Sequence, residues 1–337
     1  MTPLILGLAT TAITDAEQAF FKSIDPAGFI LFRRNVADPA QLRALTDDLR
    51  ALSGRDDVPI LIDQEGGRVA RMQPPHWPVF PTGEVFDRLY DIAPMTAMEA
   101  ARLNAEAIAA TLCHAGINVD CLPLLDVRQP GAHDIIGDRA LGAEPQRVSA
   151  LGRAVLDGLR SGGVVGVVKH VPGHGRAMAD SHVELPVVDA DAAALETDLA
   201  PFIDLADAPM AMTAHVVYPA WDAVDCASLS SKVIAEIIRG RIGFDGLLMS
   251  DDLGMHALKG DFGERASGVL KAGCDIALHC SGDMAEMEAV AGAVGTIGAE
   301  AKARLDRAMA MVAGISCSIR LEELIRRRDA LLAYLPD

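Results

Sequence analysis

The chain has 337 residues, of which 50% are hydrophobic and 23% are charged, and its 30 basic and 47 acidic side chains give a formal net charge of −17 at pH 7. This composition is typical of a globular protein with a large core, and it excludes disordered, collagen-like and coiled-coil architectures. An acidic surface repels phosphate backbones, so we expect no nucleic-acid partner. No apolar run is long and charge-free enough to span a bilayer, and we expect no membrane partner either.

The N-terminal segment and the cysteines indicate the compartment. A short apolar run opens the chain without a basic region before it, and Asp15 and Glu17 follow closely, unlike the pattern of a signal peptide. The six cysteines are scattered, without a CxxC pair: Cys113, Cys121, Cys226, Cys274, Cys280 and Cys317. We therefore expect reduced core thiols in a cytoplasmic protein.

Eight short apolar runs, rich in β-branched residues, recur along the chain and predict strands that are buried on both faces. In chain order they span residues 4–8, 28–32, 59–63, 117–126, 164–169, 209–213, 246–250 and 274–279. Between them lie longer segments with apolar residues at helical spacing, which predict amphipathic helices. The clearest of these helices span residues 39–52, 94–115, 146–158 and 230–241, the last with Ser230 as its expected N-cap.

This alternation of strands and helices predicts the fold class. Eight strands with intervening helices in a chain of this length indicate an α/β protein with a (β/α)8 TIM-type barrel. A doubly wound sheet would need a break into two halves, and no linker or shift in composition supplies one. We expect a single catalytic domain over residues 1–337, with a charged helical segment at about residues 299–335 packing on its outside.

Polar clusters follow four of the predicted strands, namely the third, fifth, sixth and seventh. The active site of a TIM-type barrel lies at the carboxyl ends of its strands, so these clusters are the candidate site. The third strand runs into the sequence DQEGGRVAR at residues 63–71, which holds two acids, two glycines and two arginines. This composition predicts a polar pocket wall that the backbone can approach closely at the glycines. The alternative is a solvated loop with a tight turn.

The fifth strand ends in the densest polar cluster of the chain, KHVPGHG at residues 169–175. His170 and His174 have the spacing of a helical metal site, but Pro172 and the two glycines make a helix implausible there, and no cysteine is near. We expect no metal.

Asp180 and His182 follow the same cluster and are two residues apart. On an extended segment they point to the same side, and an aspartate beside a histidine fixes its tautomer and supports proton transfer. The flanking glycines predict a loop that can move. The alternative is a pair of surface side chains that never meet substrate.

The sixth and seventh strands end in His215 and in the carboxylate pair Asp251 and Asp252. His215 is explained equally well as a core histidine. Neighbouring residues on a strand point to opposite sides, so one carboxylate of the pair can face the pocket while the other is hydrogen-bonded behind it. A carboxylate facing the pocket can act as a nucleophile at an anomeric carbon. A helix N-cap at Asp252 with a structural ion pair is the alternative.

Four of these segments together resemble the family 3 glycoside hydrolases: LIDQEGGRVARM, KHVPGHG with ADSHVELP, AMTAHVVYPA and SDDLGM. Within that family the chain is most similar to the single-domain bacterial β-N-acetylglucosaminidases of cell-wall recycling. The similarity runs in the right order from GFILFRRN at residues 28–35 to AGCDIALHCS at residues 272–281.

The resemblance implies a role for each matching residue. Asp251, the first Asp of SDDL, is the implied catalytic nucleophile. His182 of the DSH segment is the implied acid/base, on a mobile loop and assisted by Asp180. Five residues are implied to hold the hydroxyl groups of the sugar: Asp63, Arg71, Arg139, Lys169 and His170.

The resemblance further implies a retaining enzyme that forms a covalent glycosyl-enzyme, without metal or cofactor. Its implied substrate is a small glycan, GlcNAc–anhydroMurNAc with or without peptide, from which it removes the terminal β-1,4-linked GlcNAc, and we expect it to act as a monomer. A phosphorylase and a β-glucosidase of the same family remain open. A catalytically silent sugar-binding barrel and a metal-dependent hydrolase using His170, His174 and His182 also remain open.

Overall fold

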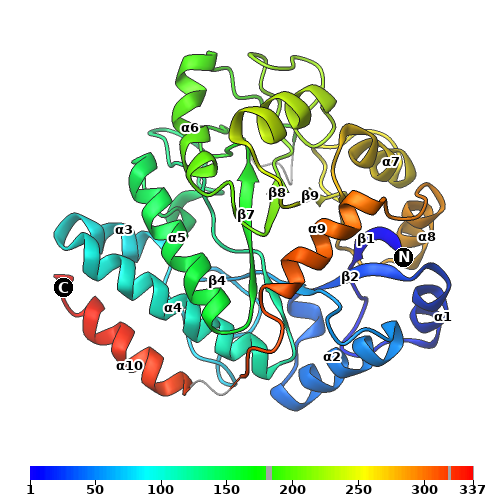
Figure 1. The fold of residues 1–337 in the computed structure, drawn as a ribbon, viewed down its shortest axis with the longest axis horizontal. Coiled ribbons are helices and arrows are strands. Elements are labelled where there is room, and N and C mark those ends of the chain that lie inside the picture. Colours follow the sequence, from blue (N-terminus) through cyan, green and yellow to red (C-terminus); the bar gives the residue numbers. More distant parts are fainter. Residues whose placement is uncertain (180–183, 318–319, 337) are drawn as a thin grey trace.

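The computed structural model describes residues 1–179, 184–317 and 320–336, and its centre is a closed barrel of eight parallel strands (Figure 1). Around the barrel the strand order is β1-β10-β9-β8-β7-β6-β3-β2, so each barrel strand lies beside its neighbours in the sequence. The predicted (β/α)8 barrel is confirmed, and each of the eight apolar runs overlaps one of its strands. Their bounds are β1 (Thr2–Leu6), β2 (Pro26–Leu31), β3 (Ile60–Ile62), β6 (Val119–Asp120), β7 (Val165–Val171), β8 (Met210–Thr213), β9 (Leu247–Asp252) and β10 (Ile276–His279).

A small antiparallel pair, β4 (Gln64–Gly66) and β5 (Val69–Ala70), follows β3 at the carboxyl end of the barrel. Gly66 and Gly67 form its turn with φ of 107° and 52°. A side chain on Gly66 would meet the carbonyl oxygen of Pro81 at 2.2 Å, so this position needs glycine both for its dihedral angle and for its close packing. The predicted close approach of the backbone at these glycines is thereby confirmed.

Helices surround the barrel (Figure 1). The predicted helices at 39–52, 94–115 and 146–158 are confirmed within a few residues. Ser230 accepts a hydrogen bond from the Val233 amide at 3.0 Å, as expected of an N-cap, although the helix that follows has wide π-type turns. The described residues contain no helix that is both long and apolar enough for a bilayer. The helical bounds are α1 (Asp15–Ile24), η1 (Arg33–Asn35), α2 (Pro39–Ser53), α3 (Gly83–Ile92), α4 (Pro94–His114), η2 (Gly137–Arg139), α5 (Pro145–Ser161), α6 (Ala192–Asp204), η3 (Val233–Ile242), α7 (Phe262–Ala272), α8 (Met284–Gly292), α9 (Ala299–Ala310) and α10 (Leu321–Leu332).

The C-terminal segment differs from the expectation of one helical stretch outside the barrel. Helix α9 lies across the amino-terminal end of the barrel (Figure 1), where Leu305, Ala308 and Met309 join the apolar cluster that fills the barrel interior. Helix α10 packs on the outside against α4, and Arg328 donates to Asn104 Oδ1 at 2.9 Å. The alternation of charged and apolar residues shows that both helices are amphipathic, but it does not show which apolar surface each one covers.

Two of the six cysteines correct the expectation of reduced thiols. Cys113, near the end of α4, and Cys317, after α9, form a disulfide with their Cα atoms 5.8 Å apart. Their separation of 204 residues is why the spacing along the chain gave no sign of it. The other four are free and buried, as expected: Cys121, Cys226, Cys274 and Cys280.

The disulfide should contribute measurably to stability, because it closes a long loop in the unfolded chain. We expect Cys113→Ser to lower the free energy of unfolding by about 2–4 kcal/mol under oxidising conditions. Urea unfolding with and without a reductant measures this difference. The reductant should destabilise the unsubstituted protein by a similar amount and leave the variant unchanged. A reductant effect of the same size in both proteins would contradict the prediction.

Candidate active site

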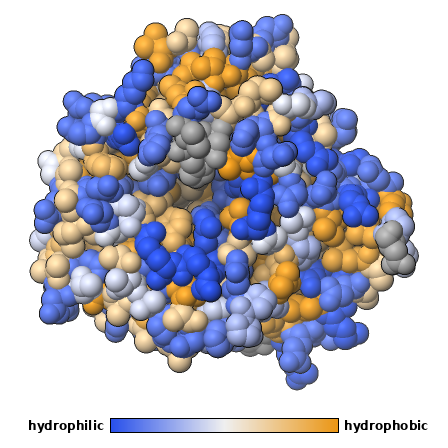
Figure 2. Space-filling model, turned by 180° about the vertical axis from the view of Figure 1, so that it is seen from behind, coloured by the Kyte–Doolittle hydropathy of each residue, from blue (hydrophilic) through white to orange (hydrophobic). Residues whose placement is uncertain are grey.

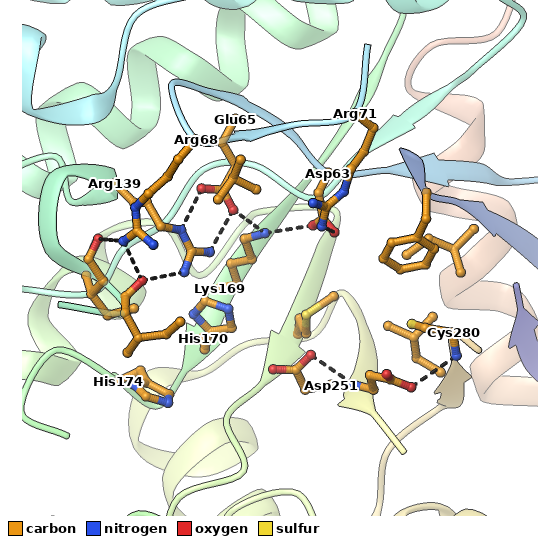
Figure 3. A pocket seen from close by; sticks show the side chains of 18 residues that line it. Asp63, Glu65, Arg68, Arg71, Arg139, Lys169, His170, His174, Asp251 and Cys280 are labelled. Carbon is orange, nitrogen blue, oxygen red and sulfur yellow. Dashed lines mark hydrogen bonds and ion pairs between the residues drawn. The ribbon is translucent and has the colours of Figure 1, made fainter. Parts of the chain in front are cut away.

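A pocket of about 270 Å³ opens at the carboxyl ends of the strands, opposite α9. Figure 2 shows this face hollowed near its centre and bordered mainly by hydrophilic residues. The pocket brings together six of the eight predicted site residues, Asp63, Arg71, Arg139, Lys169, His170 and Asp251, as Figure 3 shows. The other two, Asp180 and His182, lie outside the described residues. Charged side chains line part of the pocket, and apolar side chains line another part.

The charged wall is a network of two carboxylates and three cations. Lys169 is buried at its centre, with Nζ 3.1 Å from Asp63 Oδ1 and 2.8 Å from Glu65 Oε1. Arg71 binds the other oxygen of Asp63 at 2.8 Å. Arg139 donates two hydrogen bonds to the carboxylate of Glu65, of 2.8 and 2.7 Å. Every carboxylate oxygen of the pair therefore has a cationic partner, and the network carries one excess positive charge.

These contacts fix the charges of the network. Burial by itself raises a carboxyl pKa, but Lys169 and Arg71 hold the pKa of Asp63 well below its ordinary value. Lys169 and Arg139 likewise lower the pKa of Glu65 to about 2 against the effect of burial. The same two carboxylates raise the pKa of Lys169, although burial opposes them. The wall therefore stays ionised across the physiological pH range and offers both donors and acceptors to sugar hydroxyl groups.

His170 is oriented by a carboxylate behind it. Asp126 is fully buried, and its Oδ2 lies 2.8 Å from His170 Nδ1. Its Oδ1 accepts the backbone amides of His170 and His174 at 3.2 and 2.6 Å. Burial raises the pKa of Asp126, but the two histidines bring it down to about 2. Asp126 thus accepts a hydrogen bond from Nδ1–H of His170, and His170 presents Nε2 to the pocket.

Asp251 lies at the end of β9, beside the histidines (Figure 3). Its Oδ1 accepts the backbone amide of Asp252 at 2.8 Å. Burial raises the pKa of Asp251, but nearby His170 and His215 lower it below the ordinary value, so the group is a carboxylate at neutral pH. Asp252 is itself held, because its Oδ1 accepts the amides of Gly254 and Cys280, each at 3.0 Å. The expected hydrogen bonding of one acid of the pair is thus present, but Asp252 lines the pocket as Asp251 does, so the expectation that only one of them faces it is wrong.

Apolar side chains also line the pocket, among them Phe32, Met212, Leu278 and Cys280. Met212, Leu278 and Cys280 belong to the apolar cluster of the barrel interior, so the pocket has a closed apolar floor. Burial raises the pKa of the Cys280 thiol, which therefore stays neutral. A ring that has an apolar face and several hydroxyl groups is the kind of ligand that fits such a mixed lining.

The sequence of the chain matches the family profile described as "Glycosyl hydrolase family 3 N terminal domain" over residues 5–315. The chain belongs to glycosyl hydrolase family 3. A β-hexosaminidase from Thiobacillus denitrificans is 38% identical to it over 336 residues, which cover 98% of this chain and 92% of the relative. A β-hexosaminidase from Bordetella avium is 38% identical over 284 residues, covering 83% of this chain and 80% of the relative. The protein is therefore a glycoside hydrolase.

Solved structures agree with this family 3 assignment. The crystal structure of NagZ from Neisseria gonorrhoeae in complex with N-trifluoroacetyl-D-glucosamine superposes with a TM-score of 0.86 at 31% identity, and the match covers 98% of both chains. A family 3 β-N-acetylglucosaminidase from Paenibacillus sp. gives a TM-score of 0.85 at 31% identity, covering 98% of this chain and 67% of the other.

Two acidic residues that build this family 3 site received no role from sequence reasoning: Glu65, which lines the pocket, and Asp126, which lies behind His170. Glu65 lies two residues after Asp63, and the period of an extended segment, which puts such residues on one side, could have found it. Asp126 ends the fourth apolar run, so the same strand-end argument applied to the other strands would have included it. Within residues 1–179, 184–317 and 320–336, no three His, Cys, Asp or Glu side chains are grouped to hold a metal ion.

Proposed function

We propose that this family 3 enzyme is a retaining exo-β-N-acetylglucosaminidase of cell-wall recycling. It removes the terminal β-1,4-linked GlcNAc from GlcNAc–anhydroMurNAc fragments, with or without peptide. The observation that carries the proposal is the ionised Asp251 beside a charged wall, in a pocket of about 270 Å³ that has room for about one sugar ring. The N-acetyl preference is supported by the N-trifluoroacetyl-D-glucosamine bound to the similar NagZ from Neisseria gonorrhoeae.

The first chemical step is attack by Asp251 on the anomeric carbon. A bond forms between a carboxylate oxygen and that carbon while the glycosidic bond breaks, and His182, assisted by Asp180, gives its proton to the departing oxygen. The low pKa of Asp251 suits this role, because the attacking group must be ionised. The amide of Asp252 holds Oδ1, and Oδ2 receives no hydrogen bond from any residue that the structure describes.

The second step releases the sugar with its β configuration. His182, now neutral, takes a proton from water, the water oxygen attacks the anomeric carbon, and the bond to Asp251 breaks. An imidazole places no second negative charge beside the nucleophile during these steps. Asp63, Arg71, Arg139, Lys169 and His170 hold the hydroxyl groups, and their contacts strengthen as the ring flattens toward the oxocarbenium-like transition state.

We further propose an oligomeric state, a cellular compartment and a domain organisation for this enzyme. We propose that the enzyme acts as a monomer. The enzyme acts in the cytoplasm, and residues 1–337 form a single catalytic domain.

A proton NMR time course tests the reaction and its stereochemistry. We expect an aryl β-N-acetylglucosaminide to yield β-GlcNAc first, with the α-anomer appearing later by mutarotation, and the matching β-glucoside to remain intact. A parallel run with inorganic phosphate should give the same free sugar. Early α-GlcNAc would overturn the retaining mechanism. Cleavage of the glucoside alone would overturn the substrate, and formation of a sugar 1-phosphate would identify a phosphorylase.

His182→Ala tests the acid/base role. We expect the variant to slow hydrolysis of substrates with poor, sugar-like leaving groups by about 10²–10⁴-fold, because those leaving groups need a proton. Activated aryl leaving groups need none, so their glycosylation step should change much less. Measuring kcat/KM over a series of leaving groups checks the prediction, and equal losses across the series would contradict it.

A further inference from the structure

The strand that carries Asp251 is supported unequally by its two neighbours. Pairing between β8 and β9 runs only to Met212 and Met249, whereas β9 continues to Asp252. On the other side, β10 pairs with β9 as far as Leu278 opposite Asp252, and the Cys280 amide donates to Asp252 Oδ1 at 3.0 Å. Among the described residues, the part of β9 after Met249 therefore has no backbone pairing with β8.

The side chain of His215 lies where that pairing is missing. His215 follows β8, is fully buried, and places Nε2 3.0 Å from the backbone carbonyl oxygen of Asp252. Its Nδ1 lies 2.5 Å from the hydroxyl of Ser228, which is also fully buried and lies 2.9 Å from the carbonyl oxygen of Ala214. An imidazole thus continues the contact between β8 and β9 after their backbone pairing stops.

The two contacts of His215 determine its tautomer. A carbonyl oxygen can only accept, so Nε2 must carry a proton to bind Asp252. Burial lowers the pKa of His215, which favours the neutral imidazole with a single N–H. Nδ1 then holds a lone pair, and the single proton of the Ser228 hydroxyl has two acceptors within reach, Nδ1 at 2.5 Å and the Ala214 carbonyl oxygen at 2.9 Å. The carbonyl of Asp252 therefore sets the tautomer, and Ser228 matches it by turning its hydroxyl proton toward Nδ1.

We propose that His215, held by Ser228, is a positioning residue for the nucleophile, and this proposal rests on the proposed role of Asp251. The imidazole holds the carbonyl of Asp252, while the Gly254 and Cys280 amides hold its side chain. With both groups fixed, the amide of Asp252 stays directed at Asp251 Oδ1, 2.8 Å away. His215 does not line the pocket, so it acts on the nucleophile and not on the substrate.

The matched variants His215→Gln and His215→Asn test this role. The amide nitrogen of Gln reaches the place of Nε2 and can still donate to Asp252, whereas that of Asn reaches only the place of Nδ1. A displacement of about 1 Å at a reacting group costs roughly 100-fold in rate. We therefore expect His215→Asn to lower kcat by about 10- to 100-fold with little change in KM, and His215→Gln to remain within about threefold of the unsubstituted enzyme.

Two readouts separate positioning from a merely structural effect. The loss in His215→Asn should be the same for good and poor leaving groups, because the nucleophile acts on all of them. Labelling of Asp251 by a fluorinated, mechanism-based N-acetylglucosaminyl fluoride, followed by peptide mass spectrometry, should slow by the same factor. Equal activity of the Gln and Asn variants, or a loss confined to poor leaving groups, would overturn the proposal.

The same labelling distinguishes this inference from the proposed function. If the reagent labels a residue other than Asp251 in the unsubstituted enzyme, the proposed function fails and the inference fails with it. If Asp251 is labelled equally fast in His215→Asn, only the inference fails. If circular dichroism shows that the Asn variant does not fold, Ser228→Ala replaces it. That variant should label about three- to tenfold more slowly and recover in Ser228→Thr, and an unchanged rate in Ser228→Ala would overturn the proposal.

Discussion

We expect Asp251→Ala to lower turnover of an aryl β-N-acetylglucosaminide by about 10⁴-fold or more, because removal of a catalytic nucleophile has costs of this order. The variant keeps the charged wall of Asp63, Glu65 and Lys169, so it should still bind the sugar. Steady-state kinetics with the purified variant measure the loss of kcat. Isothermal titration with GlcNAc measures the binding that remains.

Small anions provide a control for Asp251→Ala. Azide can occupy the space left by the carboxylate and attack the anomeric carbon from the same side. It should restore part of the turnover and give an α-glycosyl azide, the opposite anomer from the normal product. Residual activity above about 1% without azide, or a β-azide product, would contradict the assignment of Asp251 as nucleophile.

We expect Lys169→Met to lower both the stability and the activity of the protein strongly. Removing this ammonium group leaves Asp63 and Glu65 buried with one cation each, and breaking a buried ion pair costs about 3–5 kcal/mol. We expect a loss of that size in the free energy of unfolding. We also expect kcat/KM to fall by about 10²–10³-fold, because Lys169 is a fixed charge within reach of the sugar. Urea unfolding and kinetics check the two expectations.

An exposed lysine provides the matched control. Lys302 pairs with Asp306 at 2.6 Å on α9, where its side chain is 47% exposed. Lys302→Met removes a surface ion pair that contributes about 0.3–0.5 kcal/mol, and it lies far from the pocket. Similar losses of stability in the two variants would contradict the central role of Lys169 in the charged wall.

The barrel could be predicted from the sequence because its strands are near-continuously apolar. Runs such as 164–169 and 246–250 have side chains buried on both faces, a pattern that belongs to parallel strands. Strand ends then placed Asp63, Lys169 and Asp251 as neighbours, since the carboxyl ends of all eight strands meet on one face.

The remaining features depend on distances that the sequence does not contain. Cys113 and Cys317 meet only because the chain after α9 returns to the end of α4. Arg139 and Glu65 are 74 residues apart in the chain, and nothing in the sequence near either residue predicts that they form an ion pair. The sequence does not distinguish His215 from a histidine that only fills the core. Its contacts with Ser228 and Asp252 become known only from the structure.

The position of α9 across the amino-terminal end of the barrel has a consequence for the order of events during turnover. Its side chains and the interior cluster close that end, so among the described residues the pocket opens at the carboxyl ends of the strands. A sugar bound at the floor cannot leave past a leaving group that still occupies the mouth. The leaving group must therefore depart first, and water must enter by the same route before the sugar is released. If the enzyme acts as proposed, a chain terminus should reach the floor and internal linkages of a longer glycan should stay intact.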